Sequence, residues 1–193
     1  MSLPPELLVS AYGQGIFPMA DMDGSIAWYR PDPRAILPLD SFHVPHSLRR
    51  VMRGARLEFR RDTEFSRVIQ ACAEQTVDRP NTWISPDIVE AYTTLHDQGI
   101  AHSVEVWRNK RLVGGLYGVA IGGLFAGESM FNRSRDASKA ALVHLVDHLI
   151  ERGFILLDIQ FMTDDLRQFG AIEIPAREYQ ERLEKALLVP ADW

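Results

Sequence analysis

Two carboxylates of this 193-residue chain lie in otherwise apolar stretches, where an acidic side chain needs an explanation. Asp158 stands two residues before Gln160 in the apolar segment Phe154–Phe161, and Glu128 follows Gly127 in the sequence GESMF. Residues two apart in a strand share one face, so Asp158 and Gln160 would place an acid beside an amide. A carboxylate buried in such surroundings needs a hydrogen-bonding partner.

Glu128 lies in a glycine-rich stretch, Leu112–Leu142, in which six glycines fall within 14 residues. These are Gly114, Gly115, Gly118, Gly122, Gly123 and Gly127. Glycine weakens a strand, so this density indicates bulges, tight turns, or another molecule close to the backbone. The simpler alternative is an ordinary hairpin whose Glu128 points to solvent.

A basic patch precedes this stretch and is opposed in sequence only by Glu58. Its members, which we call the basic patch, are Arg49, Arg50, Arg53, Arg56, Arg60 and Arg61. A helix over Ser47–Arg53 and a strand over Arg56–Arg60 would bring several guanidinium groups to one edge. Guanidinium forks match phosphate oxygens in pairs, although a solvated charged face explains the pattern equally well.

Other residues with chemical potential are weaker candidates. His144 and His148 are four apart on a predicted helix, the spacing of a zinc pair, but are expected on its solvent side without a third ligand. We therefore predict no metal site. Cys72, the only cysteine, falls on the apolar face of a predicted helix and is expected in the core. A lone cysteine excludes an intramolecular disulfide and fits a reducing cytoplasm.

Composition indicates one large domain, or one domain with a small appendage. With 46% hydrophobic and 24% charged residues, the chain can form a sizeable core. No apolar run approaches the ~20 residues of a membrane helix, and no export signal is evident, so we expect a cytoplasmic protein. The net charge of −5 tolerates a cationic substrate, whereas an anionic partner requires a local patch.

The candidate residues must be positioned by a mixed sheet with helices on its faces, an α/β or α+β fold. Hydrophobic periodicity and capping residues predict five helices. They run over Pro5–Gly13, over Glu64–Gln75, from Ser85 to Gly99, from a cap at Ser134 or Asp136 to Gly153, and from Pro175 through Leu188. Strands are predicted over His102–Trp107, Leu112–Ala120, Leu124–Phe131, Phe154–Phe161 and Gly170–Ile174, with a loop over Met162–Gln168. After its helix, the region up to residue 40 is expected to be extended or looped.

Several motifs occur together in a characteristic order. They are Gly15-Ile16-Phe17-Pro18, Trp28 with Pro31-Asp32-Pro33-Arg34, Thr82-Trp83-Ile84, His102–Trp107, Val113–Val119, Gly127-Glu128-Ser129-Met130-Phe131, Ala137-Ser138-Lys139 and Asp158-x-Gln160. Over about residues 7–183, this set resembles the bacterial leucyl/phenylalanyl-tRNA–protein transferases. GESMF together with the upstream GGLYGV and the downstream DxQ is a specific signature.

The resemblance implies an activity and a fold. Such enzymes transfer leucine or phenylalanine, less often methionine, from aminoacyl-tRNA to the N-terminal arginine or lysine of a protein, which marks that protein for degradation through the N-end rule. The implied fold is α+β, with a small N-terminal lobe (residues 1–40) on a catalytic domain similar to the GCN5-related N-acetyltransferases (residues 41–193). No cofactor, metal or membrane partner is expected.

The resemblance also implies roles for particular residues. Asp158 and Gln160 would be the catalytic pair, in which Asp158 orients or polarises Gln160 or relays the amine proton. Glu128 would hold an amine, that of either the aminoacyl group or the acceptor. The resemblance leaves open which of these residues is the general base. Trp83 would stack on the terminal adenine, and the basic patch would bind acceptor-stem phosphates. The aminoacyl pocket would be formed by Met130, Phe125, Leu116, Leu142 and Leu157. Leu145 is nearby but is expected to be plain core.

Two other functions fit the chain less well. An acyl-CoA-dependent N-acetyltransferase needs a glycine-bearing pyrophosphate loop at a helix start, and Arg135–Lys139 lacks those glycines. A non-catalytic tRNA- or peptide-binding module would not need Asp158, Gln160 and Glu128. Departures from the family pattern are Met19 in place of an aromatic residue, and Thr163 and Asp165 where many members have Asn and His.

Overall fold

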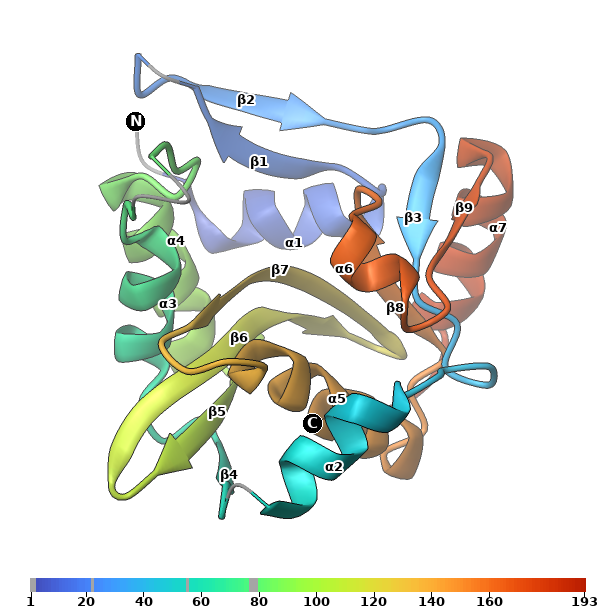
Figure 1. The fold of residues 1–193 in the computed structure, drawn as a ribbon. Coiled ribbons are helices and arrows are strands. Elements are labelled where there is room, and N and C mark those ends of the chain that lie inside the picture. Colours follow the sequence, from blue (N-terminus) through green and yellow to red (C-terminus); the bar gives the residue numbers. More distant parts are fainter. Residues whose placement is uncertain (1–2, 22, 55, 77–79) are drawn as a thin grey trace.

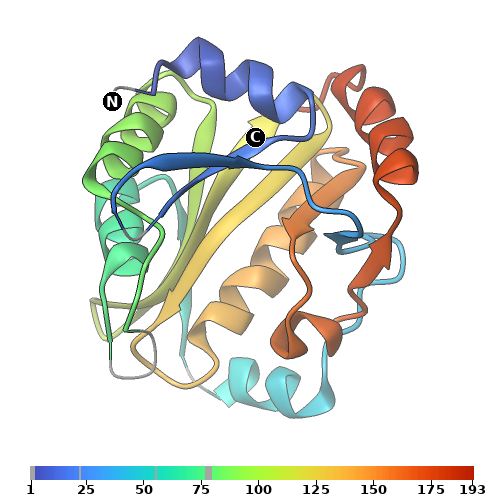
Figure 2. The same ribbon diagram turned by 90° about the horizontal axis from the view of Figure 1, so that it is seen from above.

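A seven-stranded mixed sheet forms the centre of the protein (Figures 1 and 2). The computed structural model describes residues 3–21, 23–54, 56–76 and 80–193. In spatial order the strands are β4 (Glu58–Arg61), β5 (Ala101–Arg108), β6 (Arg111–Ile121), β7 (Leu124–Asn132), β8 (Leu156–Gln160), β3 (Arg34–Ile36) and β9 (Ile172–Ile174). Every neighbouring pair is antiparallel except β7 and β8, which are parallel.

Helices cover both faces of this sheet (Figure 2). One face is covered by α1 (Pro5–Gly13), α3 (Phe65–Ala73), α4 (Pro86–Asp97) and α7 (Ala176–Leu187). The other face is covered by α2 (His46–Gly54) and α5 (Ala137–Glu151). The expected α+β fold with helices on the sheet faces is therefore confirmed. In the described part of the chain, no helix combines the length and apolarity needed to cross a bilayer.

Local sequence accounts for the helices that flank the site. Ser85 caps α4 by accepting a hydrogen bond from the Ile88 amide, and Pro86 occupies the first turn. The predicted apolar stripe of α3 is buried, and Cys72 is completely inaccessible, as expected for a core residue. Helix α5 connects the parallel strands β7 and β8, which a short turn cannot join. It packs against the sheet and is buried along most of its length.

Strands β7 and β8 separate partway along their length. Their pairing ends at Ala126 and Asp158, although β7 continues to Asn132. In the β6–β7 ladder, Tyr117 pairs with Ser129, whereas the next residue of β6 pairs with Gly127. The intervening Glu128 is consequently the extra residue of a β-bulge, a feature that redirects a side chain and bends its strand.

The glycine-rich stretch has mainly a packing explanation. A Cβ atom at Gly114 would lie 2.5 Å from the Cβ of Ala137 on α5, and one at Gly118 would overlap the ring of Phe125. Gly127 is different, because a Cβ there would meet nothing closer than 3.6 Å. The expectation that a substrate lies against the glycine backbone therefore applies only to Gly127, since a Cβ at each of the other five glycines would come within 3.0 Å of a protein atom.

The N-terminal residues are more ordered than the extended or looped lobe that the sequence predicts. After α1, strands β1 (Phe17–Ala20) and β2 (Ile26–Tyr29) form an antiparallel hairpin. Strand β3 then enters the large sheet between β8 and β9. The division into residues 1–40 and 41–193 stays a prediction, and β3 of the smaller part is a strand of the main sheet.

The segment Met162–Gln168, predicted as a loop, contains the short helix α6 (Asp164–Arg167). Thr163 caps this helix by accepting a hydrogen bond from the Leu166 amide at 3.2 Å. A single helical turn has too few residues to show an apolar period, which is why the sequence did not reveal it.

Candidate active site

A cavity of about 940 Å³ opens where β7 and β8 separate. The wall from β6, β7 and α5 contributes mainly apolar side chains, while α6 forms a more polar side with Thr163 and two aspartates. The cavity is lined by Leu116, Tyr117, Gly127, Glu128, Ser129, Met130, Leu142, Leu145, Leu157, Ile159, Gln160, Phe161, Thr163, Asp164, Asp165 and Leu166. An apolar cavity with a few convergent polar groups is typical of a small-ligand site.

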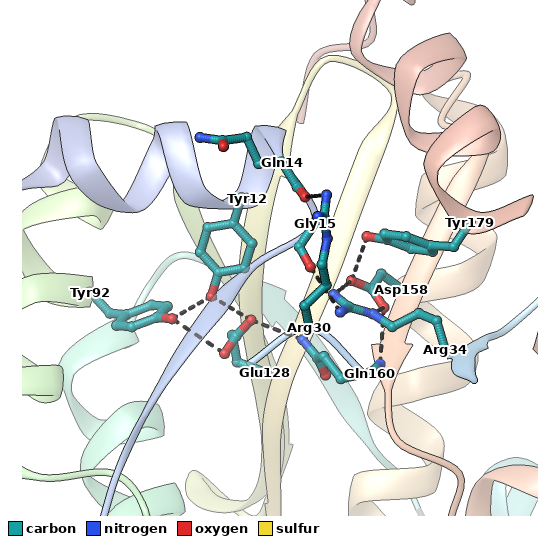
Figure 3. Close-up of polar contacts among 10 residues, drawn as sticks. All are labelled: Tyr12, Gln14, Gly15, Arg30, Arg34, Tyr92, Glu128, Asp158, Gln160 and Tyr179. Atoms are coloured by element: carbon teal, nitrogen blue, oxygen red, sulfur yellow. Dashed lines mark hydrogen bonds and ion pairs between the residues drawn. The ribbon is translucent and has the colours of Figure 1, made fainter. Parts of the chain in front are cut away.

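Glu128 is held in the cavity wall by three hydrogen-bond donors (Figure 3). The Tyr12 hydroxyl donates to Oε1 at 2.7 Å, and Gln160 Nε2 donates to the same oxygen at 3.1 Å. The Tyr92 hydroxyl has a single proton, which it donates either to Oε2 at 3.4 Å or to the hydroxyl of Tyr12, with which it is also hydrogen-bonded. The ordinary-hairpin alternative requires Glu128 to point to solvent. These hydrogen bonds show that it does not.

The surroundings favour a protonated Glu128 at neutral pH. Burial raises the pKa of this carboxyl to about 8. The hydrogen bond from Tyr12 opposes that shift, while the negative charge of Asp158 increases it. Burial also raises the pKa values of Tyr12 and Tyr92 well above 10, so both hydroxyls stay protonated.

Asp158 is almost fully buried and hydrogen-bonded through both oxygens (Figure 3). Oδ1 accepts from Arg34 Nε at 2.9 Å and from the Gln160 amide at 3.0 Å. Oδ2 accepts from Arg34 Nη2 at 2.6 Å and from the Tyr179 hydroxyl at 2.9 Å. Asp158 does not line the cavity and bonds to the backbone of Gln160 rather than to its side chain.

The Gln160 side chain faces the cavity with one end fixed. Its amide nitrogen is held by Glu128, while its amide oxygen has no hydrogen-bond partner among the described residues and points away from Glu128 (Figure 3). An amide oxygen is an acceptor with two lone pairs. The site thus presents a free acceptor next to a carboxyl group that is neutral at pH 7.

Most residues expected in the aminoacyl pocket line this cavity. Met130, Leu116, Leu142 and Leu157 do so, and so does Leu145, which the sequence assigned to plain core. Phe125 does not line the cavity, because its ring packs in the core and stacks on Trp193 with 5.2 Å between the ring centroids. The strict alternation of the sequence prediction fails beyond Asp158, since β8 bulges at Ile159 before it reaches Gln160.

The residues expected to bind tRNA lie outside this cavity. Trp83 lines a second cavity of about 530 Å³ with residues of the β1–β2 hairpin, and its carbonyl accepts a hydrogen bond from the Ala20 amide. All six arginines of the basic patch are exposed. Arg60 pairs with Glu58 at 3.1 Å, and Arg61 contacts His144. Within the described segments, the patch arginines of α2 and Arg56 have no ion-pair partner.

The expectation that His144 and His148 face solvent is wrong. His144 stacks on Phe59 at 4.8 Å, and the nearly inaccessible His148 packs against Trp193 at the end of the chain. Burial, together with the charge of Arg61, lowers the pKa of His148 to about 4. Across the described residues, no three histidine, cysteine or acidic side chains are grouped as a metal site would need.

Two departures from the family pattern belong to the cavity rim. Thr163 caps α6, and Asp165 forms an ion pair with Lys139 of α5 at 2.9 Å. Both residues therefore help to place α6 beside the cavity. Met19, the third departure, packs on the edge of the hydrophobic core next to the hairpin partner strand.

Sequence analysis missed four residues of the polar network. Tyr12 and Tyr92 lie on the apolar faces of α1 and α4, where they look like ordinary core residues. Arg34 was visible only as the last residue of Pro31-Asp32-Pro33-Arg34, and Tyr179 only as an apolar position of the last helix. Their contacts with Glu128 and Asp158 join segments that are more than 20 residues distant in the chain. No short sequence motif contains both partners of such a contact.

Comparison with known proteins identifies the family. Residues 36–184 match the family model of leucyl/phenylalanyl-tRNA protein transferase, and residues 1–32 match that of its N-terminal domain. The chain belongs to the leucyl/phenylalanyl-tRNA protein transferase family. This confirms the resemblance that its motifs indicate.

Curated members of the leucyl/phenylalanyl-tRNA protein transferase family are similar along almost the whole chain. The protein of this name from Herpetosiphon aurantiacus is 56% identical over 186 residues, covering 96% of this chain and 95% of the relative. The one from Phenylobacterium zucineum is 54% identical and covers 96% of this chain and 85% of the relative. The similarity to these relatives thus extends over both the main part of the chain and its N-terminal segment.

Similar solved structures are more distant. L-PGS from Bacillus licheniformis is 13% identical, with a TM-score of 0.47, covering 93% of this chain and 62% of that chain. A ribosomal-protein-alanine N-acetyltransferase from Brucella melitensis is 17% identical, with a TM-score of 0.40, covering 58% of this chain and 86% of that chain.

Proposed function

We propose that this protein transfers leucine or phenylalanine, and less readily methionine, from aminoacyl-tRNA to the N-terminal arginine or lysine of an acceptor protein. The transfer forms a peptide bond and would mark the acceptor for degradation through the N-end rule in the cytoplasm. The observation that carries this proposal is the apolar cavity with Glu128 and Gln160 in its wall, in a chain that belongs to the transferase family.

The reaction is the aminolysis of an ester: the acceptor α-amine attacks the carbonyl carbon that joins the amino acid to the ribose, and a C–N bond forms. The ester C–O bond then breaks, and the ribose oxygen leaves as a hydroxyl with a proton in place of the one that the amine gives up. Because an α-amine has a pKa of about 8, a useful fraction is neutral at pH 7 and needs no strong base. The protein must hold this amine against the ester and receive or release protons as the bond forms.

Gln160 is suited to orient the amine. Its amide oxygen is an unoccupied acceptor, and its amide nitrogen is tethered to Glu128 at 3.1 Å, so the acceptor has a fixed direction. An amine N–H donated to this oxygen would aim the nitrogen lone pair away from Gln160. Positioning of this kind can supply a large share of the rate.

Glu128 would complete the polar end of the cavity. With a pKa near 8, its carboxyl is neutral before reaction and can gain or lose a proton at little cost at physiological pH. Its Oε1 lies 3.1 Å from Gln160 Nε2, so the carboxyl and the amide line the same end of the cavity, and the role of holding an amine stays a prediction for Glu128. Asp158, with both oxygens occupied by four donors, would act on the geometry of the site rather than as the proton acceptor.

The apolar part of the cavity would receive the amino-acid side chain. Met130 is flexible and adapts to both a branched aliphatic and an aromatic group. Leu116, Leu142 and Leu157 provide the remaining apolar surface. A stacking contact from Trp83 to the terminal adenine and phosphate contacts from the basic patch would hold the tRNA without reading its sequence.

The direct test is transfer of labelled leucine from leucyl-tRNA to a peptide with N-terminal arginine, beside a matched peptide with N-terminal alanine. Labelling of the arginine peptide alone is the expected result, and equal or absent labelling of the two would refute the proposal. Acetyl-CoA supplied in place of leucyl-tRNA should leave both peptides unlabelled, which separates the reaction from N-acetylation. Asp158→Ala and Glu128→Gln should each reduce labelling strongly, and full activity in both would refute the site.

A further inference from the structure

Arg34 is a buried cation whose guanidinium contacts three parts of the chain. Only 1% of its side chain is exposed. Nε and Nη2 form a two-point ion pair with the Asp158 carboxylate, and Nη1 donates to the carbonyl of Gly15 at 3.0 Å. The planar group lies between the rings of Phe17 and Tyr179, 4.8 and 4.5 Å from their centres. Each nitrogen of the fork therefore has a defined partner.

Gln160 adopts an unusual backbone conformation at the end of β8. Its φ is +58°, in the left-handed region that residues other than glycine seldom adopt. The Gln160 amide donates to Asp158 Oδ1, and the amide of Phe161 donates to the carbonyl of Ile159 at 2.7 Å. An uncommon conformation of this kind persists only where its surroundings impose it. The Asp158 carboxylate is the side-chain group that does so here.

The turn determines where the Gln160 side chain points. Strand β8 pairs with β3 in a register that skips Ile159, so the regular alternation of side chains ends there. The left-handed residue that follows carries its amide to Glu128 on the neighbouring β7. If the carboxylate of Asp158 rotated, the Gln160 amide would lose its acceptor and the turn could relax toward an ordinary strand.

We propose that Arg34 and Tyr179 are positioning residues, which fix the Asp158 carboxylate so that it holds Gln160 in the left-handed turn that aims its amide at Glu128. The inference rests on the proposed function, because Gln160 matters to the reaction only if the cavity binds the aminoacyl ester and the amine. Neither Arg34 nor Tyr179 lines the cavity, so both act through Asp158 and not on the substrate.

The chemistry of the ion pair explains why arginine is needed. A guanidinium fork can donate two parallel hydrogen bonds to one carboxylate, whereas an ammonium group is a point charge with no fixed plane. Arg34→Lys keeps the positive charge but cannot hold both carboxylate oxygens and the Gly15 carbonyl together. Tyr179→Phe is a milder change, because it removes only the hydroxyl that donates to Oδ2 and keeps the ring that stacks on the guanidinium.

A matched control comes from Arg30, which is exposed and joins the same two segments. Arg30 Nη2 donates to the carbonyl of Gln14 at 2.7 Å (Figure 3). The same nitrogen donates to the side chain of Gln180 at 3.2 Å. These residues are the sequence neighbours of Gly15 and Tyr179. Arg30→Lys thus perturbs the tether between the N-terminal segment and α7 without touching Asp158.

The experiment measures single-turnover transfer and its dependence on aminoacyl-tRNA concentration for wild type, Arg34→Lys, Tyr179→Phe and Arg30→Lys. We expect Arg34→Lys to lower kcat by about tenfold to a hundredfold, with KM for aminoacyl-tRNA changed by less than about twofold, because the cavity lining is intact. Tyr179→Phe should give a smaller loss of the same kind, and Arg30→Lys should match wild type. An equal loss in Arg30→Lys, or an effect confined to KM, would overturn the proposal. If Arg34→Lys does not fold, Tyr179→Phe decides between the same outcomes.

A double-mutant cycle tests whether the effect passes through Gln160. In a Gln160→Ala background, Arg34→Lys should cost no further activity, since the group that it positions is already gone. Additive losses would overturn the inference. The side-chain amide resonances of Gln160, assigned by their absence in Gln160→Ala, give a readout that needs no turnover. They should shift toward those of a free glutamine in Arg34→Lys and stay unchanged in Arg30→Lys; unchanged resonances in Arg34→Lys would also overturn it. If the wild-type protein transfers no amino acid, the proposed function is refuted. The Gln160 resonances would still show whether Arg34 positions the Gln160 side chain.

Discussion

The protonated state of Glu128 makes a prediction about stability that is independent of activity. Replacing Glu128 by glutamine leaves a neutral group of similar shape that cannot ionise. In the folded wild type this carboxyl keeps its proton up to a pKa of about 8, because burial disfavours its charge, whereas its ordinary value is 4.5. Between these two values the folded protein binds a proton that the unfolded chain has released. The free energy of unfolding of the wild type must then fall as pH rises through this window.

The size of the effect follows from the width of the window. Each pH unit between the two pKa values costs about 1.4 kcal/mol of stability, and the curve flattens near each end. From pH 5 to pH 8 the wild type should therefore lose about 3 kcal/mol relative to Glu128→Gln. For a domain of this length, that difference corresponds to about 6–12 °C in Tm.

The assay is urea unfolding of both proteins at four or five values between pH 5 and pH 8.5. Other groups titrate in this range or close to it, including His148, whose pKa burial lowers to about 4. They are present in both proteins, so the difference between the two curves isolates Glu128. The difference should change steadily in favour of Glu128→Gln as pH rises. Two parallel curves would refute the reasoning, because they would mean that Glu128 is ionised in the folded protein throughout.

Three further predictions concern packing and tRNA binding. Gly118→Ala should lower the free energy of unfolding by about 1–3 kcal/mol, since its methyl group would overlap Phe125; Gly127→Ala, where space is open, should be nearly neutral in the same urea titration. Trp83→Leu should raise KM for aminoacyl-tRNA by about tenfold with little change in kcat. Trp28→Leu, a change at an exposed tryptophan, should leave this KM as in wild type. A Trp83→Leu protein with the KM of wild type would refute stacking on Trp83. Replacing the three patch arginines of α2 by alanine should flatten the salt dependence of KM for aminoacyl-tRNA, by roughly one unit of log–log slope per lost phosphate contact; an unchanged slope would assign these residues to a solvated face.

Much of the fold was predictable because its longer elements carry strong periodic patterns. The limits of α1 agree with the prediction at both ends, the N-cap of α4 was correctly placed at Ser85, and the helix ends as expected before Gly99, which follows the C-cap Gln98 with a φ of +71°. The hairpin of β6 and β7 was also expected. Two short elements escaped, β3 with three residues and α6 with four, which are too few for a period to appear, whereas β9, also of three residues, was expected within Gly170–Ile174. The sequence also gives no sign that β3 leaves the N-terminal part to pair with β8.

The candidate site was predictable in its composition and not in its connections. Glu128, Gln160 and four of the five predicted pocket residues surround one cavity, because polar residues in apolar strands are conspicuous. Phe125 was misplaced although it pairs with Leu157 and lies on the same face of the sheet, because its ring stacks on Trp193, a contact that the residue pattern does not reveal. The bulge at Glu128 and the left-handed turn at Gln160 break the regular alternation of side chains and cannot be counted from the residue pattern. The buried partner of Asp158 lies 124 residues away in sequence, beyond the reach of local rules.

The insertion of β3 between β8 and β9 has a consequence for biosynthesis. Arg34 leaves the ribosome early, but its carboxylate partner follows 124 residues later, and the hydroxyl of Tyr179 comes 21 residues after that. Until then a guanidinium destined for the interior has nothing to neutralise it, so β3 cannot be buried in its final place. The reaction centre is therefore completed only near the end of translation, when the last helix has formed. A ribosome-bound chain that stops before α7 should carry the apolar cavity wall, exposed and without transfer activity.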